Sequence, residues 1–247
     1  MSDFWQLWGE AAITSLEKVY SIEPSFRAEK SRTRRHLTEF WQIEAEAAHA
    51  SLEDIMNVQE ALLVHVSKEV VAHGSPEFAI LNKTFSPPTP PFTRIPYSKA
   101  VETLQGLDYK FNWGDDFGAV EERVLSHQYS QPFFITHFPR QCKAFYHDPD
   151  PANPEVTLSA DLLAPQGFGE IAGGGQRISD YPTLIQSLKQ FNLPASDYDW
   201  YLDLRRYGGV MHSGFGMGIE RVLRWILQLS HIREACLFPR TPVRVYP

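Results

Sequence analysis

Cysteine is scarce in this sequence, which has 247 residues and two cysteines, Cys142 and Cys236. The two lie far apart, with no CxxC motif and no histidine cluster beside either of them. This spacing excludes a zinc site built on cysteine pairs and favours a reducing compartment. Because unpaired cysteines behave as small hydrophobic residues, we expect two buried thiols.

Long apolar runs are missing too. No stretch approaches the roughly 20 residues that a helix needs to cross a bilayer, and the first residues are acidic and aromatic, unlike a signal or transit peptide. We therefore expect a soluble, intracellular protein with no membrane partner. A cytoplasmic location is the first expectation, and a mitochondrial one stays open.

An excess of positive charge is the third thing the chain lacks. It has 23 Lys and Arg against 30 Asp and Glu, giving a formal net charge of −7 and a pI of about 5.7. Proteins that grip nucleic acid by themselves usually carry a basic surface. The totals count against independent nucleic-acid binding, although Lys30 to Arg35 form a local basic cluster.

The composition that remains is typical of a folded enzyme-sized domain. Hydrophobic residues make up 43% of the chain and aromatic residues 13%, enough for one large core and too much for a disordered chain. We expect a single domain over residues 1–247. A proline-rich connector, residues 84–95, is the best candidate for an extended surface insertion.

Hydrophobic periodicity predicts helices that flank a group of strands. Ser51 begins a helical pattern with an acidic first turn, and this pattern runs to His73. Further helices are expected at 97–104, 120–127, 181–191, 196–207 and 218–229. Residues 16–23 are expected to be a helix end that runs into a strand, and further strands are expected at 25–27, 39–44, 132–138, 144–147, 158–163, 170–171 and 213–216. This order predicts an α+β fold, an antiparallel sheet with helices packed on it.

One cationic region stands out, at residues 26–44. Arg27 and Glu29 lie two apart, so on a strand they face the same side. Arg35 and His36 belong to a charged loop, and Phe40 follows at the start of the return strand with Glu44 on the same side. Each feature alone is as well explained by surface ion pairs or core packing. Together they suit a nucleoside triphosphate, which needs guanidinium groups for phosphates and a flat ring for its base.

Two carboxylates in the middle of the chain suggest a metal site. Asp161 and Glu170 bracket a Pro-Gln-Gly-Phe-Gly turn, so a hairpin would bring them together. Mg²⁺ is commonly held by one or two carboxylates plus substrate oxygens. Gly173-Gly174-Gly175 follows, which alone would be a flexible turn, and then Arg177, which can bind a carboxylate or amide oxygen.

Glycines alternate near the end of the chain, at positions 214, 216 and 218, and Glu220-Arg221 follows them. Their spacing and the absence of a β-α-β unit exclude the dinucleotide-binding fingerprint. Glycines at alternate positions clear one face of a strand, and Arg221 on the following helix would lie over that cleared face.

Taken together, these residues resemble the catalytic core of the class II aminoacyl-tRNA synthetases. Phe26-Arg27-Ala28-Glu29 with Arg35-His36-Leu37-Thr38-Glu39-Phe40 is similar to the second motif of that class, and residues 214–221 are similar to its third motif. Within the class, the chain resembles the asparaginyl members of the aspartyl/asparaginyl subgroup, through stretches spread over nearly its whole length. The resemblance implies a six- to seven-stranded antiparallel sheet flanked by helices.

The resemblance also implies a role for each site residue, with ATP and Mg²⁺ as cofactors. Arg27 would bind the α-phosphate, Arg221 would bind the γ-phosphate or cover the adenine, and both would be catalytic. Glu29 would meet the adenine amine. The remaining assignments are ATP contacts for Arg35, His36, Phe40, Gly216 and Gly218, Mg²⁺ ligation for Asp161 and Glu170, and amino-acid binding for Gln6, Glu44 and Arg177.

The sequence departs from the family pattern in several places. The first motif, which forms the dimer interface, would precede Gln6, and five residues cannot hold it, which counts against the usual homodimer. The anticodon-binding OB barrel is absent as well, which counts against selection of a tRNA, although tRNA stays a possible acceptor. Gly9 replaces the lysine of the aspartyl relatives, which favours asparagine over aspartate. His147 and Met211 replace other residues beside the expected pocket.

Three functions fit these observations. The first is ATP-dependent adenylation of asparagine, or of an aspartate-like amino acid, by a synthetase-type ligase of protein biosynthesis. The second is a stand-alone paralogue that forms an amide from an aminoacyl-adenylate, as an asparagine synthetase does. The third is a truncated, non-catalytic binding protein.

Overall fold

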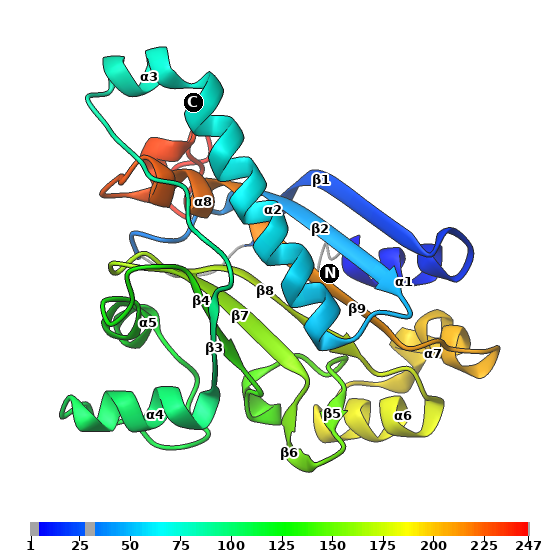
Figure 1. Ribbon diagram of the computed structural model, residues 1–247. Helices are drawn as coiled ribbons and strands as arrows, with labels where there is room; N and C mark the ends of the chain where they lie inside the picture. Colours follow the sequence, from blue (N-terminus) through cyan, green and yellow to red (C-terminus); the bar gives the residue numbers. More distant parts are fainter. Residues whose placement is uncertain (1–4, 28–32, 247) are drawn as a thin grey trace.

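The computed structural model describes residues 5–27 and 33–246. Within these ranges the central element is a seven-stranded sheet with the order β1-β2-β9-β8-β7-β4-β3 (Figure 1). Neighbouring strands are antiparallel except β3 and β4, which are parallel. The strands of this sheet are β1 (Lys18–Phe26), β2 (Glu39–Ala48), β3 (Thr93–Pro96), β4 (Phe133–Thr136), β7 (Ser159–Ala164), β8 (Gly169–Arg177) and β9 (His212–Gly218).

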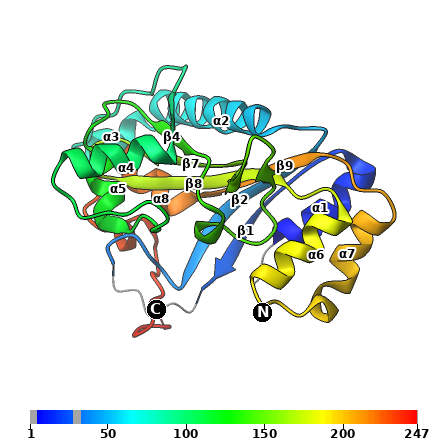
Figure 2. The same cartoon turned by 90° about the horizontal axis from the view of Figure 1, so that it is seen from below.

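Helices lie on both faces of this sheet (Figure 2). The α-helices are α1 (Trp5–Leu16), α2 (Leu52–His73), α3 (Ser75–Ile80), α4 (Tyr97–Gly106), α5 (Ala119–Ser126), α6 (Tyr181–Gln190), α7 (Asp199–Arg206) and α8 (Ile219–Ile226). Three 3₁₀ turns, η1 (Arg140–Cys142), η2 (Ala195–Tyr198) and η3 (Ile232–Ala235), and a small hairpin of β5 (Pro149–Asp150) and β6 (Asn153–Thr157) complete the described part. The predicted α+β class and the mostly antiparallel sheet are confirmed.

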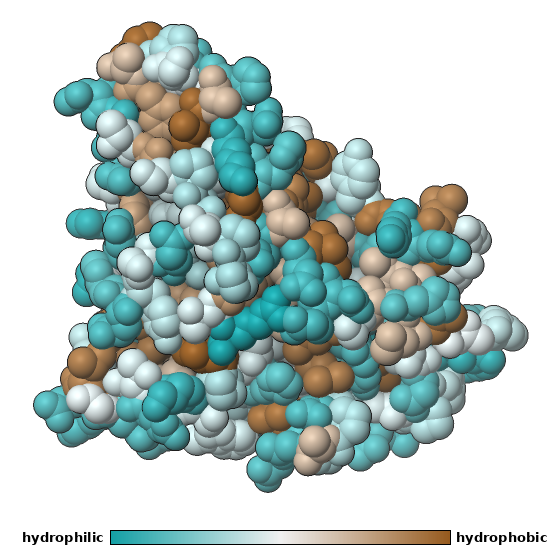
Figure 3. Space-filling model, viewed as in Figure 1, coloured by the Kyte–Doolittle hydropathy of each residue, from teal (hydrophilic) through white to brown (hydrophobic). Residues whose placement is uncertain are grey.

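The longest helix, α2, covers one face of the sheet. It begins with the predicted cap: the Ser51 hydroxyl accepts from the Asp54 amide, and the Asp54 carboxylate accepts from the Ser51 amide. Its buried side packs on a core that includes Phe134, Leu162 and Phe215 from three strands. Its outer side is polar, and hydrophilic residues predominate on this face of the molecule (Figure 3). None of the described helices is both long and apolar enough to cross a membrane.

On the opposite face of the sheet, among the described residues, helices pack near the ends. Near β3 and β4 the sheet packs on α4 and α5, in a cluster with Tyr97, Leu125 and Phe133 at its centre. At the far end, α6 and α7 form a separate cluster with Phe145. Between these clusters, side chains alternate along each strand, so the positions next to those that pack on α2 point to this uncovered middle.

A strip of glycines runs through this uncovered middle. Gly173 pairs with Gly216, and Gly175 pairs with Gly214, across the ladder of β8 and β9. Directly opposed residues of an antiparallel pair point to the same face. At these four positions β8 and β9 therefore contribute no side chain on the side of the sheet away from α2.

Three local predictions were wrong. Residues 144–147 form a turn with one isolated bridge from His147 to Arg177, because Phe145 is drawn into the α6–α7 cluster. The Gly173–Gly175 run lies inside β8, since hydrogen bonds to β7 and β9 on both sides hold it extended. Both cysteines are only half-buried.

The residues of the expected connector are irregular up to β3, and Phe92 is buried against α2.

Candidate functional site

A cavity of about 140 Å³ opens on the uncovered face, between the end of β1, the start of α8 and the central strands. Seven of the eight residues predicted to bind ATP line it, together with Glu170. Glu29, the eighth, lies outside the described residues. The seven are Arg27, Arg35, His36, Phe40, Gly216, Gly218 and Arg221. The fold thus brings together residues that are almost 200 positions apart in the sequence.

Three arginines give this cavity its positive charge. The Arg27 guanidinium lies 6.0 Å from the centre of the Phe40 ring. Arg35 forms an ion pair with Glu122 at 2.6 Å, and Arg221 forms one with Glu170 at 2.9 Å. Guanidinium groups at a partly open cavity are suited to phosphate oxygens, which they can bind through two parallel hydrogen bonds.

The glycines of β9 differ in the space around them. A Cβ atom at Gly216 or Gly218 would meet only ordinary van der Waals neighbours, the nearest at 3.4 and 3.5 Å. A Cβ atom at Gly214 would overlap the Glu46 carboxylate. Packing within the protein therefore requires glycine at position 214. At 216 and 218 it does not, which leaves room above the strand for a ligand.

The two predicted metal ligands converge at one edge of the cavity. The β7–β8 hairpin forms as predicted, and a Cβ atom at Gly173 would lie 3.0 Å from Asp161 Oδ1 and 3.4 Å from Glu170 Oε1. The two carboxylates thus flank the same point above a residue without a side chain. Arg221, Lys143 and Arg35 outweigh the effect of burial on Glu170 and hold its pKa at about 2.

Lys143, which had no predicted role, forms an ion pair with Asp161. Lys143 Nζ lies 2.6 Å from both carboxylate oxygens and 3.9 Å from the centre of the Phe138 ring. Burial raises the pKa of Asp161, whereas Lys143 opposes this shift. The pKa of Lys143 is raised, because the attraction of Asp161 exceeds the cost of burial. The side chain of Lys143 therefore supplies a positive charge at this carboxylate.

The two carboxylates, Asp161 and Glu170, fit the ligand requirements of Mg²⁺. Among residues 5–27 and 33–246 no group of three or more acidic, histidine or cysteine side chains could hold a metal alone. Mg²⁺ prefers few carboxylates and fills its other positions with water and phosphate oxygens. Asp161 and Glu170 beside a cationic cavity match that preference.

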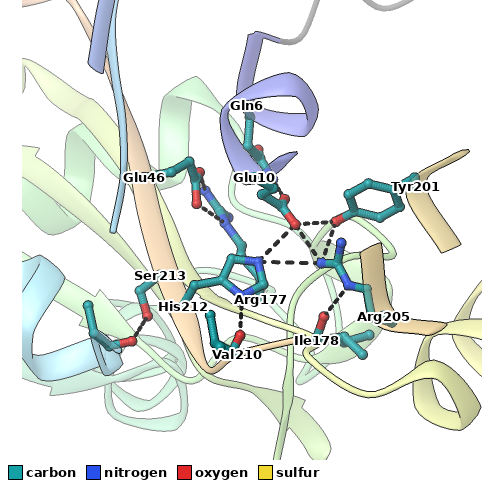
Figure 4. Close-up of polar contacts among 11 residues, drawn as sticks. Gln6, Glu10, Glu46, Arg177, Ile178, Tyr201, Arg205, Val210, His212 and Ser213 are labelled. Carbon is teal, nitrogen blue, oxygen red and sulfur yellow. Dashed lines mark hydrogen bonds and ion pairs between the residues drawn. The ribbon is translucent and has the colours of Figure 1, made fainter. Parts of the chain in front are cut away.

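At the other end of the sheet, Arg177 points from β8 to a carboxylate on β2 (Figure 4). Its Nη2 lies 2.6 Å from Glu46 Oε1 and its Nε lies 3.3 Å from Oε2, so the pair is bidentate. Both side chains are almost fully buried, at 3% and 1% exposure. Burial would lower the pKa of Arg177, but Glu46 outweighs it and raises that pKa. The ring of Tyr146 lies 5.3 Å from the guanidinium.

The other two predicted amino-acid ligands are buried near this pair. Gln6 on α1 donates from Nε2 to Glu10 Oε1 at 3.0 Å. Glu44 on β2 accepts from Gln42 at 3.0 Å through Oε1, while its buried Oε2 has no hydrogen-bond partner. Burial, together with Glu23 and Glu46, raises the pKa of Glu44 to about 7. A buried carboxylate oxygen without a partner is costly unless a ligand supplies the donor.

Sequence reasoning missed three residues of this site: Glu10, Glu46 and Lys143. The alternation that placed Phe40 and Glu44 on one face of β2 continues to Glu46, so the period of the strand could have identified it. Lys143 and Glu10 carry no such signal, because their partners lie on distant segments.

Comparisons with known proteins identify the family of this chain. Residues 2–242 match the family described as tRNA synthetases class II (D, K and N). The chain is similar to the asparagine–tRNA ligase of Pyrococcus abyssi, with 51% identity over 250 residues that cover 100% of this chain and 58% of that protein. It is also similar to that of Pelotomaculum thermopropionicum, with 49% identity and the same coverage.

Solved structures give the same picture. The asparaginyl-tRNA synthetase of Pyrococcus horikoshii, complexed with asparaginyl-adenylate, superposes with a TM-score of 0.95 and 50% identity, over 100% of this chain and 58% of that chain. An aspartyl-tRNA synthetase from Entamoeba histolytica superposes with a TM-score of 0.93 and 30% identity, over 100% and 53%. The chain thus spans a little over half the length of the relatives that it matches.

Proposed function

Because the chain belongs to the class II tRNA synthetases (D, K and N), we propose that it activates an amino acid with ATP, and that this amino acid is asparagine. The reaction joins a substrate carboxylate to the α-phosphate of ATP. The carboxylate oxygen forms a bond to phosphorus, the bond from the α-phosphorus to the bridging oxygen breaks, and pyrophosphate leaves with that oxygen.

The ATP end of the site supports the first half of this proposal. Arg27 would neutralise the charge that develops on the α-phosphate, and Phe40 beside it would stack on the base. Arg35, His36 and Arg221 would bind the outer phosphates. Asp161 and Glu170 would hold Mg²⁺, which when bound supplies further positive charge to the phosphates. Positioning and charge neutralisation account for most of such catalysis, so no general base is required.

The observation that carries the choice of asparagine is the buried pair of Arg177 and Glu46. An amide presents one acceptor, its oxygen, and one donor group, its NH₂. Arg177 can donate to that oxygen, and Glu46 can accept from that NH₂. The carboxylate of aspartate presents acceptors only, so it would bring a second negative charge to Glu46. Leaving a buried polar group of the site unpaired is what gives large discrimination between such similar substrates.

Glu44 and Gln6 would bind the substrate ammonium. The unpartnered Oε2 of Glu44 is one acceptor that the described residues leave open. An ammonium placed there would satisfy this oxygen and favour the ionised form of Glu44, whose pKa stands near 7 without a ligand.

We propose tRNA as the acceptor and a second copy of the chain as a partner. Support for the acceptor comes from relatives named asparagine–tRNA ligases. Support for the partner comes from the outer face of β1, where Tyr20, Ile22 and Phe26 are exposed next to Trp41 of β2. Exposed apolar groups of this kind mark interaction surfaces. The oligomeric state in solution tests the partner. A cytoplasmic location stays a prediction.

Pyrophosphate exchange with each candidate amino acid tests the proposed function. Exchange that depends on asparagine and not on aspartate is the expected result. Exchange with aspartate, together with AMP release that requires ammonia, would instead show a stand-alone amide-forming paralogue. Folded protein that binds ATP and exchanges pyrophosphate with neither amino acid would overturn the proposal.

A further inference from the structure

Glu10 is the most heavily hydrogen-bonded carboxylate at the amino-acid end of the site, and the proposed reaction gives it no role. Its side chain is fully buried on α1. One oxygen, Oε2, accepts from Arg205 Nη2 at 2.5 Å and from the Tyr201 hydroxyl at 2.7 Å, both on α7, and it lies 2.9 Å from His212 Nε2 on β9. The other oxygen, Oε1, accepts from Gln6 Nε2 at 3.0 Å. Figure 4 shows this group beside the pair of Arg177 and Glu46.

These partners keep Glu10 ionised. Burial would raise the pKa of Glu10, but Arg205 and His212 outweigh it and hold that pKa well below the ordinary value. An ionised carboxylate has no proton to donate, so it can only accept hydrogen bonds.

The ionised state of Glu10 determines how the Gln6 amide is turned. The two ends of a glutamine amide differ, because the NH₂ end donates and the oxygen end accepts. Only the NH₂ end can bond to an acceptor, so the oxygen end of Gln6 is directed away from Glu10. Within residues 5–27 and 33–246, the contact with Glu10 is the side-chain hydrogen bond that orients this amide.

That orientation matters for the substrate ammonium, which has donors only and requires acceptors. With the NH₂ end bound to Glu10, the oxygen end of Gln6 is available as an acceptor. With the amide turned round, two donor groups would face each other in a buried site, which is unfavourable.

We propose that Glu10 is a positioning residue that fixes the carbonyl oxygen of Gln6 as an acceptor for the substrate ammonium. This inference rests on the proposed function, because it takes the ammonium to be that of the amino acid. It assigns a role to Glu10, which contacts Gln6 and is not proposed to contact the substrate.

The experiment compares Glu10→Gln in two backgrounds, wild type and Gln6→Ala, by pyrophosphate exchange. In the wild-type background Glu10→Gln should raise the KM for asparagine by about tenfold, the loss typical of one hydrogen bond to a charged group, and leave the KM for ATP unchanged. In the Gln6→Ala background it should add no further increase, because the residue through which it acts is gone. Inhibition by succinamate, which lacks the ammonium, should be equal in wild type and Glu10→Gln.

Two further variants separate positioning from folding. Glu10→Asp keeps the negative charge next to Arg205 and withdraws the carboxylate from Gln6. It should therefore raise the KM for asparagine as Glu10→Gln does. It provides the test if Glu10→Gln does not fold. Tyr201→Phe removes one hydrogen bond to Glu10 Oε2 and leaves the contact with Gln6, so it should leave the KM for asparagine unchanged.

An equal rise in KM with and without Gln6 would overturn the inference, since Glu10 would then act only through general structure. An unchanged KM in both folded Glu10 variants would overturn it too. A wild-type chain that does not use asparagine would overturn the proposed function and this inference together, whereas an active wild type with unaffected variants would overturn the inference alone.

Discussion

The two ends of the site differ in how deeply their ion pairs are buried. At the ATP end, arginines line a cavity that is open enough to admit a ligand, and a Cβ atom at either glycine there would make only ordinary contacts. At the amino-acid end, Arg177 and Arg205 already have buried carboxylate partners, Glu46 and Glu10. At the ATP end Arg35 and Arg221 also have carboxylate partners, Glu122 and Glu170, but the side chains of these pairs are more exposed.

This difference separates two tasks. A polyphosphate carries several negative charges and can be held by an excess of positive charge, with little demand on the exact position of each group. A small amino acid differs from its competitors by one polar group, so the groups that read it must be fixed in advance. Buried and mutually paired side chains meet that demand, since removing one partner leaves a buried charge without compensation.

The largest effect is expected at the ATP end. Arg27→Ala should lower the rate of adenylation by about 100-fold or more, because it removes a charge donor to the transition state. Pyrophosphate exchange at saturating asparagine measures it. Arg123→Ala, on the exposed side of α5, is the matched control and should be close to wild type. An active Arg27→Ala enzyme would remove the basis for placing the α-phosphate here.

The next effect belongs to the amino-acid end. Gly214→Ala places a methyl group where the Glu46 carboxylate lies, so Glu46 must move away from Arg177. We expect the free energy of unfolding to fall by about 3 kcal/mol, the usual cost of separating a buried ion pair. The KM for asparagine should also rise, because Glu46 has moved away from Arg177. Chemical denaturation and exchange kinetics measure the two effects, and an unchanged stability would contradict the close contact.

The pH dependence of asparagine binding probes Glu44. Its pKa of about 7 means that Glu44 gains a proton as the pH falls through 7, and a neutral carboxyl group no longer neutralises an ammonium. The KM for asparagine should rise by about tenfold from pH 8 to pH 6, and inhibition by succinamate should not follow it.

Glu44→Gln is the control for this profile. It should flatten the dependence on pH and, since the raised pKa costs stability as the pH rises through 7, it should raise the melting temperature at pH 8. A profile that keeps its slope in Glu44→Gln would assign the titration to another group, such as Glu46.

The smallest effect is expected from Gly218→Ala. Its methyl group meets only ordinary neighbours in the protein, so stability should change by less than about 1 kcal/mol. The methyl group would occupy space above β9, so the KM for ATP should rise several-fold while that for asparagine stays near wild type. Gly214→Ala and Gly218→Ala thus test the two ends of the site on the same strand. Equal effects of both on stability would contradict the distinction.

Local patterns were enough to predict most elements of the fold. The cap at Ser51, the periodicity of α2 and the hairpin between Asp161 and Glu170 follow from short-range rules, and all three are present. The turn at 144–147 could not be predicted, because its cause is packing of Phe145 against α6 and α7. Packing against residues that are distant in the sequence can override the strand propensity of a segment.

The predicted ATP residues were found through motifs, and the structure places the described ones around one cavity. Their roles stay predictions. What sequence reasoning could not supply was pairing: nothing near Glu10 in the chain indicates that its partners are Tyr201, Arg205 and His212. The same holds for Lys143 and Asp161. Charge partners brought together by the sheet are visible only once the strand order is known.

The paired glycines of β8 and β9 have a consequence for distance. Between the carboxylate pair and the pair of Arg177 and Glu46, β8 and β9 contribute backbone only, and the side chains over their glycines come from β2 and His147. Two reactants held by their far ends would therefore meet above the regular backbone of these two strands. The register of β8 and β9 therefore sets the distance between the proposed ATP site and the proposed amino-acid site. A slip by one residue would turn every side chain of the strand to the other face, and ATP and amino acid would lose their sites together.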